Sequence, residues 1–319
     1  MGKQAGQTTM PWSHHSHSGQ YCGHAASSLE EVVETAIKNK MSVFCLTEHM
    51  GRHRQDFYPE EEQDHDEASL AKLYDDFYVE ARRLQKAYAE QITLFVGFEG
   101  EWIRPESLAL IKELLAKHEV DLFIGSVHHA HAFPIDYDHT LYYQAREAAG
   151  GTDEQIFLDY FDSQYAMLEA LRPPLVGHFD LIRLKSDDPE RSFKTWPAVW
   201  QKVLRNLAYI AEYGGVLELN SSSLRKGMTE PYPQVGICQA FKEMGGRFTL
   251  SDDSHGVEQV GLNYGKVMKC IEKAGINELV HLARADSAES GLGMRFSHVK
   301  WETVGLEQLK RHAFWKVVS

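Results

Sequence analysis

Short apolar segments recur along this chain, and almost every one of them runs directly into a histidine, a glutamate or an aspartate. After the N-terminal segment, they lie at 42–47, 92–98, 121–127, 174–177, 216–219 and 247–251. Their apolarity is continuous rather than alternating, which indicates strands buried on both faces of a sheet. Helix-like segments separate them, so we expect parallel strands joined by right-handed crossovers. An open doubly wound sheet and a closed barrel both remain compatible with this pattern.

The positions of the polar residues favour the barrel. In a barrel of parallel strands all the carboxyl ends open at one mouth, whereas in an open sheet they are strung along an edge. Residues of metal-binding type follow nearly every expected strand, and a barrel would bring them together. Counting the N-terminal segment, we expect seven strands rather than eight.

The segments between the strands carry helix start and stop signals. A serine and an acidic first turn open the first helix, and glycine pairs end two later ones. We expect helices at 27–37, 69–89, 107–117, 153–171, 196–212, 235–244 and 257–274. No linker divides the chain. We therefore expect residues 1–11 to form a disordered N-terminal extension and residues 12–319 to form a single barrel domain.

The N-terminal segment contains the densest group of histidines, from His14 to His17, with His24 seven residues later. In an extended chain, side chains alternate between faces, so His15 and His17 point to one side and His14 to the other. Neutral imidazoles on one face bind zinc, iron and similar ions. Ser18 and Gly19 allow a turn that returns His24 to the same place. The alternative is a polar leading segment or the remnant of a purification tag.

Nine residues at or near strand ends are candidate metal ligands: His15, His17, His24, His49, Glu99, His128, His178, Asp253 and His255. Their order resembles the PHP (polymerase and histidinol phosphatase) superfamily. That superfamily carries an H-x-H, a later histidine, an acid–histidine pair, a lone glutamate, two single histidines and a closing D-x-H. The resemblance covers about residues 12–260. Within the superfamily, the chain resembles the monofunctional histidinol-phosphate phosphatases, and the stretches that carry this are 13–19, 47–49, 125–129, 177–180 and 250–255.

The resemblance implies an α/β fold with a distorted seven-stranded (β/α)7 TIM-like barrel, the PHP fold. It implies a metal-dependent phosphomonoesterase that hydrolyses L-histidinol phosphate to L-histidinol and phosphate in histidine biosynthesis. The cofactors would be two or three divalent transition-metal ions, drawn from zinc, iron and manganese. Many members of the superfamily have aspartate before the histidine of the second strand. This chain has Glu48 there, so Glu48 is not included among the ligands.

The residues themselves indicate the same chemistry. Nine ligands exceed the three or four that one zinc ion takes from a protein, so they suit two or three ions bridged by Glu99 or Asp253. Such ions lower the pKa of bound water, so hydroxide exists near neutral pH, and they hold phosphate oxygens during in-line displacement. We expect attack by a metal-bound hydroxide, with Asp253, His178 and His255 as the catalytic residues.

Binding of the phosphate requires fixed positive charge near the mouth of the barrel. Arg183 and Arg225 both follow strand ends, and arginine grips phosphate oxygens in a bidentate manner. Ordinary solvated arginines are the alternative. Glu101 and His129 are further candidates for contact with the substrate.

An acidic segment at 56–67, which includes Phe57 and Tyr58, follows His49. Either it folds over the substrate, with an acid against the amine and a ring against the imidazole, or it is a solvated loop.

Cys22 lies inside the histidine segment, where it either approaches the metals or is a small buried residue. We expect six further histidines to be surface residues, namely His53, His65, His118, His281, His298 and His312.

Composition argues against several other classes of protein. The formal net charge is -13 and no basic stripe exists, which disfavours a nucleic-acid binder. No apolar run is long enough to span a bilayer. Four cysteines without C-x-x-C spacing do not form a disulfide scaffold, so we expect a cytoplasmic protein. The expected partner is a small-molecule phosphate monoester, and the oligomeric state stays open. The alternatives are a phosphoesterase acting on a nucleotide or a nucleic-acid end, and a non-catalytic PHP scaffold.

Overall fold

The computed structural model describes residues 11–286, 292 and 295–316, and it contains the expected barrel. Seven parallel strands lie in the order β1-β2-β3-β4-β7-β8-β9. Their bounds are Trp12–Ser13, Val43–Leu46, Thr93–Glu101, Leu122–Ser126, Leu175–Val176, Val216–Asn220 and Arg247–Ser251. The prediction of seven parallel strands is therefore confirmed. Residues 1–10 of the expected N-terminal extension lie outside the described residues.

The first and last strands of this sheet lie next to each other, which nearly closes the barrel. The backbone N–H of His14 donates to the carbonyl of Leu250 at 3.3 Å, and Ser16 forms a parallel bridge with Ser254. The indole of Trp12 donates to the hydroxyl of Thr249 at 2.8 Å. Because β1 and β9 meet, the carboxyl ends of all seven strands surround one mouth.

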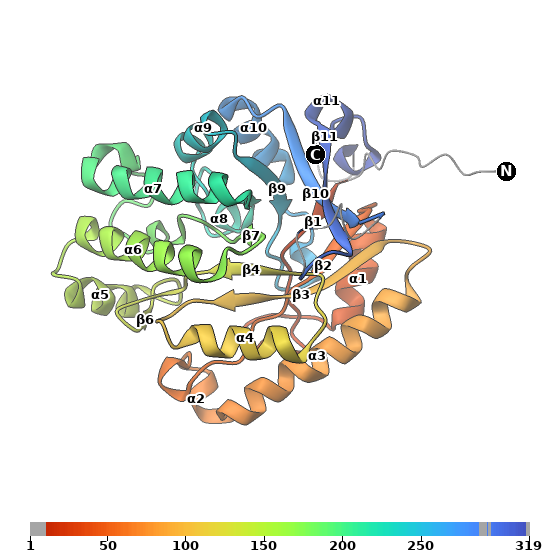
Figure 1. The fold of residues 1–319 in the computed structure, drawn as a ribbon, viewed down its shortest axis with the longest axis horizontal. Helices are drawn as coiled ribbons and strands as arrows, with labels where there is room; N and C mark the ends of the chain where they lie inside the picture. Colours follow the sequence, from red (N-terminus) through yellow and green to blue (C-terminus); the bar gives the residue numbers. More distant parts are fainter. Residues whose placement is uncertain (1–10, 287–291, 293–294, 317–319) are drawn as a thin grey trace.

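Helices cover the outside of the strands (Figure 1). The longer ones are α1 (Leu29–Lys38), α3 (Glu67–Ala87), α4 (Ser107–Lys117), α5 (His139–Ala148), α6 (Asp153–Leu171), α7 (Pro197–Tyr213), α9 (Val235–Glu243) and α10 (Tyr264–Ala274). The short ones are α2 (Glu61–Asp64), α8 (Ser222–Arg225) and α11 (Leu306–Leu309). Ser28 and Glu31 form a capping box on α1, and Gly214 ends α7. Within the described residues, no helix is both long and apolar enough to cross a bilayer.

The expected helix at 257–274 is wrong in its first part. A 3-10 turn, η4 (Val257–Gln259), comes first, and α10 begins only at Tyr264. Gly261 has φ +72° and Asn263 has φ +65°, which lie outside the range of a right-handed helix. A side chain at Gly261 would also meet the ring of Phe314 at 2.9 Å. The break lets the N–H of Gly261 donate to Asp252 at 2.7 Å, which holds this segment beside the barrel mouth.

An antiparallel hairpin of β10 (Glu278–Arg284) and β11 (Val299–Gly305) packs beside β9 (Figure 1). The N–H of Leu282 donates to Nε2 of His14 at 3.0 Å, so His14 points away from the barrel interior and toward this hairpin. His281 is 2% exposed and lies 4.8 Å from the ring of Trp12. The expectation of a surface position for His281 is therefore wrong, because the hairpin buries it against β1. A second small hairpin pairs β5 (His129–Ala130) with β6 (Phe133–Pro134).

Candidate metal centre

Glu99 on β3 lies at the centre of the nine expected ligands and is 1% exposed. Its Oε2 lies 3.2 Å from Nε2 of His15 and 3.5 Å from Nε2 of His17. Asp253, which follows β9, has Oδ1 3.6 Å from Nε2 of His17. The extended chain after β1 turns both rings inward and His14 outward, as the alternation of side chains predicts.

The other carboxylate oxygen of Glu99 faces a second group of ligands. Oε1 lies 2.9 Å from Nε2 of His178 and 3.3 Å from Nε2 of His128. These two nitrogens are 3.0 Å apart. His128 follows β4 and His178 follows β7, and the two strands pair directly. Glu99 therefore turns one oxygen toward each group, as a bridging carboxylate does.

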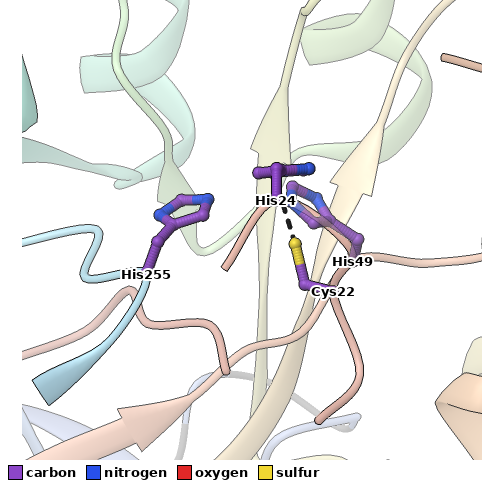
Figure 2. A group of neighbouring side chains, drawn as sticks. All are labelled: Cys22, His24, His49 and His255. Carbon is purple, nitrogen blue, oxygen red and sulfur yellow. Dashed lines mark hydrogen bonds between the residues drawn. The ribbon is translucent and has the colours of Figure 1, made fainter. Parts of the chain in front are cut away.

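Three histidines form a third group beside the first two. Nδ1 of His49 lies 3.1 Å from Oε2 of Glu99, and the ring of His24 lies 5.1 Å from that of His255. Figure 2 shows the thiol of Cys22 next to the rings of His24 and His49, with the ring of His255 on the other side of the group. The structure thus brings all nine expected ligands together, although they come from widely separated parts of the sequence.

Some of the buried nitrogen atoms of this cluster have no hydrogen-bond partner among the described residues, which suits a site for metal ions. Nε2 of His15 and Nε2 of His17 are buried and form no hydrogen bond of normal geometry with the described residues. A buried polar atom without a partner destabilises a protein by roughly 1–3 kcal/mol. Imidazole nitrogens and carboxylate oxygens are ligands that divalent transition metals accept. The residues present therefore fit divalent metal ions.

Two buried glutamates orient the ligand rings from behind. Oε2 of Glu218, on β8, accepts a hydrogen bond from Nδ1 of His15 at 3.1 Å. Oε1 of Glu48 accepts one from Nδ1 of His17 at 2.9 Å. Each bond leaves Nε2 of the ring for the metal centre. Sequence reasoning missed Glu218 and assigned Glu48 no role. The signal for Glu218 was an acid in the middle of an otherwise apolar strand.

The carboxylates of the cluster are held ionised by their neighbours. Burial alone would raise the pKa of Glu99, but the nearby His15 and His128 hold it well below its usual range. Burial also opposes ionisation of Asp253, and His15 and His255 outweigh it, so that this pKa is also low. Both groups are therefore charged at neutral pH and able to bind cations.

A cavity of about 370 Å³ opens above this cluster and is lined by seven of the nine ligands. Arg225 and Lys226 contribute positive charge to its wall, whereas Glu60 and Asp136 contribute negative charge. Tyr58 and Tyr137 add aromatic rings, whose centroids lie 6.0 Å apart. A larger hollow, about 870 Å³, lies near Asp121 at the other end of the strands and contains none of the nine ligands.

The four residues expected to bind substrate lie in different places. Arg225 lines the cavity, and its guanidinium donates to the carbonyl oxygen of Asp253 at 2.9 Å. Arg183 is not brought to the cavity: it is buried and donates to Asp180 and to backbone carbonyls. Glu101 lies behind the cavity wall, 2.7 Å from Arg52. His129 is buried beside Tyr58, and burial lowers its pKa to about 3.

The acidic segment after His49 is fixed to the barrel rather than open to solvent along its whole length. Its first residue, Asp56, is buried and pairs with Arg104, and Glu61 pairs with Arg52 at 2.6 Å. Tyr58 and Glu60 line the cavity, as the lid hypothesis requires. Phe57 instead packs against Arg54 and does not line the cavity.

Comparison with known proteins points to one family. The family model described as "PHP domain" matches residues 13–222 of this chain. A protein of Schizosaccharomyces pombe named "Probable histidinol-phosphatase" is 45% identical over 272 residues, which cover 85% of this chain and 89% of the relative. The "Histidinol-phosphatase" of Saccharomyces cerevisiae is 34% identical over 317 residues, which cover 89% of this chain and 95% of the relative.

Solved structures show the same fold. A crystal structure of a histidinol phosphate phosphatase from Lactococcus lactis, complexed with zinc, L-histidinol and phosphate, matches with a TM-score of 0.67. The match covers 85% of this chain and 96% of that one, at 20% sequence identity. At this level of identity the likeness concerns the fold, and it agrees with the seven-stranded barrel described above.

Proposed function

This chain belongs to the PHP domain family, and from that premise we propose that it hydrolyses L-histidinol phosphate to L-histidinol and phosphate. The observation that carries the proposal is the convergence of nine metal-binding side chains, with Glu99 at their centre, directly below a cavity with Arg225 in its wall. The named histidinol-phosphatases at 45% and 34% identity support the choice of substrate. The reaction would place the chain in histidine biosynthesis.

The metal ions are proposed to number two or three and to be zinc, iron or manganese, with zinc favoured by the histidine-rich ligands. His15, His17, Glu99 and Asp253 would hold one, Glu99, His128 and His178 a second, and His24, His49 and His255 a third. Once bound, such ions activate water and neutralise charge on the phosphate. The ions would thus supply the activated water, which the side chains that line the cavity do not supply by themselves.

The protein side chains position the substrate and its protons. Arg225 carries a permanent charge that would face the phosphate oxygens. Nδ1 of His255 donates to the carbonyl of Asp253 at 2.9 Å, which fixes the tautomer and leaves Nε2 for the centre. We assign Asp253, His178 and His255 as catalytic residues because all three line the cavity. Arg183 is left out of the substrate contacts, since it is buried and does not line the cavity.

The acidic and aromatic wall of the cavity suits the amine and imidazole of histidinol. Glu60 and Asp136 lie on the same cavity as Tyr58 and Tyr137. Carboxylates attract an ammonium group and would repel a second phosphate, which disfavours the alternative of a nucleotide or nucleic-acid end. Glu101 and His129 are proposed to support this wall from behind. We also propose that residues 12–319 form one domain, and the four free cysteines are consistent with a cytoplasmic location.

The test is phosphate release from L-histidinol phosphate, a sugar phosphate, a nucleoside monophosphate and a small neutral phosphate ester. We expect efficiency to be highest for L-histidinol phosphate, and we expect a chelator to abolish activity and added metal to restore it. His17→Ala, Glu99→Ala and Asp253→Ala should each remove most activity, without additive losses, because these ligands act as a unit. His131→Ala, outside the cavity, is the matched control. Full activity after chelation, or a clear preference for the nucleotide, would contradict the proposal.

A further inference from the structure

Cys22 is buried, but among the described residues it lies outside the large cluster of packed apolar side chains that contains Cys45 and Cys238. Its Sγ lies 3.3 Å from Nε2 of His24. Figure 2 shows the thiol directed toward the rings of His24 and His49, with His255 on the far side of the group. Packing of a small apolar residue does not account for this position, because the neighbours of the sulfur are ring nitrogens.

A tight turn holds the sulfur in this place. The N–H groups of Tyr21 and Cys22 both donate to the carbonyl of Ser18, at 3.1 Å and 2.9 Å, and the N–H of Ala25 donates to the carbonyl of Cys22 at 3.1 Å. These bonds fix the backbone on both sides of the cysteine. The thiol and His24 therefore lie side by side, two residues apart in one turn, within the group that also contains His49 and His255.

The number and kind of ligands fit one tetrahedral ion, and the ligand atoms lie close enough to approach the distances that such an ion requires. Sγ of Cys22 and one nitrogen each of His24, His49 and His255 all lie within 4.8 Å of one another. Atoms bound to one tetrahedral zinc ion lie about 3.4–3.6 Å apart, given Zn–N and Zn–S bonds of about 2.1 and 2.3 Å. Nε2 of His49 is buried and forms no hydrogen bond of normal geometry with the described residues. The unpaired nitrogen of His49 is a second, independent sign that a ligand belongs among these four residues.

We propose that Cys22, as a thiolate, is the fourth protein ligand of the ion held by His24, His49 and His255, and that it makes this position selective for zinc over manganese. This inference rests on the proposed function in one respect: both assume that metal ions occupy the site. On binding, the thiol releases its proton to solvent and a Zn–S bond forms. Soft thiolate favours zinc, whereas manganese favours carboxylate, carbonyl and water. Three histidines and one cysteine also complete the four ligands that zinc prefers.

The first test replaces the metals of the full-length protein with cobalt and records the near-ultraviolet spectrum. We expect a sulfur-to-cobalt charge-transfer band in the wild type and in Cys270→Ser, a control cysteine on α10 outside the centre. The band should be lost in Cys22→Ser and Cys22→Ala. A wild-type protein loaded with cobalt but lacking the band, or a band that persists in both Cys22 variants, overturns the proposal. If these variants do not fold, X-ray absorption of the zinc-loaded wild type decides: a sulfur neighbour at about 2.3 Å supports the proposal, and only nitrogen and oxygen neighbours overturn it.

The second test measures zinc–manganese competition in the same proteins. Loss of a direct ligand should lower the preference for zinc at one position by at least about tenfold in Cys22→Ser, since loss of even an outer partner weakens metal binding by about 10–100-fold. An unchanged preference overturns the selectivity. Phosphate release from L-histidinol phosphate is measured on the same samples. A cobalt–sulfur band without phosphate release rejects the proposed function and keeps Cys22 as a ligand. Phosphate release without the band keeps the proposed function and rejects Cys22 as a ligand.

Discussion

Nδ1 of His15 lies 3.1 Å from a carboxylate oxygen of Glu218, while Nε2 of the same ring lies 3.2 Å from Glu99. One imidazole is therefore held between a carboxylate behind it and a carboxylate in the metal centre. The first contact fixes the tautomer, because Nδ1 carries the proton that it donates to Glu218. It thereby leaves the lone pair of Nε2 available for a metal ion.

Glu218→Gln should weaken metal binding without unfolding the barrel. The amide keeps the shape of the side chain but removes the charge that raises the basicity of His15, so affinity should fall by about 10–100-fold. Titration against a competing chelator measures the change. Glu212→Gln, an exposed residue at the end of α7, is the matched control. Equal affinities in the wild type and Glu218→Gln would show that Glu218 is only a packing residue.

Arg225→Gln should weaken binding of the phosphate group. A charge-assisted hydrogen bond contributes about 1.5–3 kcal/mol, which corresponds to roughly 10–150-fold in affinity. We expect kcat/KM to fall and inhibition by free phosphate to weaken by a similar factor, because both depend on the same contact. Arg191→Gln, which is exposed and outside the cavity, should change neither. If phosphate inhibits Arg225→Gln as strongly as the wild type, Arg225 does not contact the phosphate.

The fold and the ligands were accessible to sequence reasoning because they depend on local patterns. Continuous apolar strands such as Val43–Leu46 have no polar face to place in solvent, so burial on both faces of a parallel sheet follows. Ligands such as His128 and His178 come just after these strands, Glu99 lies near the end of β3, and a barrel gathers strand ends whatever the details of packing. Neither inference required knowledge of contacts between distant side chains.

Residues whose role depends on distant contacts were missed or misplaced. Arg183 follows a strand end as Arg225 does, but Asp180 and the carbonyl of Pro231 take up its donors. His281 lies after the last expected helix, in a segment without an expected partner, and the packing of the hairpin on Trp12 buries it. The start of α10 depends on the backbone of Gly261, which periodicity does not describe. The positions of Arg183 and His281 are decided by residues far away in the sequence, and the start of α10 is decided by the backbone conformation.

Asp121→Asn should destabilise the barrel without altering the metal centre. Asp121 is 1% exposed, pairs with Arg82 at 2.9 Å and with Arg284 at 3.0 Å, and accepts the N–H of Val96 at 2.7 Å. Loss of one partner from a buried ion pair destabilises by about 3–5 kcal/mol, and we expect the low end because the arginines are partly solvated. Denaturant unfolding measures this, with Asp188→Asn as an exposed control.

The same substitution should change how stability depends on pH. Burial raises the pKa of Asp121, but Arg82 and the N–H of Val96 outweigh it and hold the pKa below the ordinary value of 3.8. A carboxyl with a lowered folded-state pKa stabilises the protein fully above its unfolded pKa and loses this contribution as pH falls through the folded pKa. The wild type should therefore exceed Asp121→Asn by a constant amount above about pH 5, and the difference should shrink below about pH 4. A difference that stays constant to lower pH would mean that the charge of Asp121 contributes nothing.

Asp136 is the carboxylate that we expect to recognise the amine of histidinol. It lines the cavity, and its Oδ1 is buried without a hydrogen-bond partner in the described part of the chain. Burial, with Asp136 as the next contribution, raises the pKa of Tyr58 well above its ordinary value, so the tyrosine stays neutral beside the carboxylate. An ammonium group placed here would satisfy the free oxygen. Glu60 is less suited, because it already lies 3.4 Å from Nδ1 of His24.

Asp136→Asn should therefore lower kcat/KM for L-histidinol phosphate and leave a small neutral phosphate ester unaffected. Loss of a charge-assisted contact of about 1.5–3 kcal/mol predicts a fall of roughly one to two orders of magnitude for the first substrate only. Glu62→Gln, an exposed acid of the segment at 56–67, removes the same charge from the surface and should change neither value. A single substitution is preferable to deleting that segment, because the pairs Asp56–Arg104 and Glu61–Arg52 anchor it to the barrel. Equal losses for both substrates in Asp136→Asn would place Asp136 in support of the metal centre rather than in recognition of the amine.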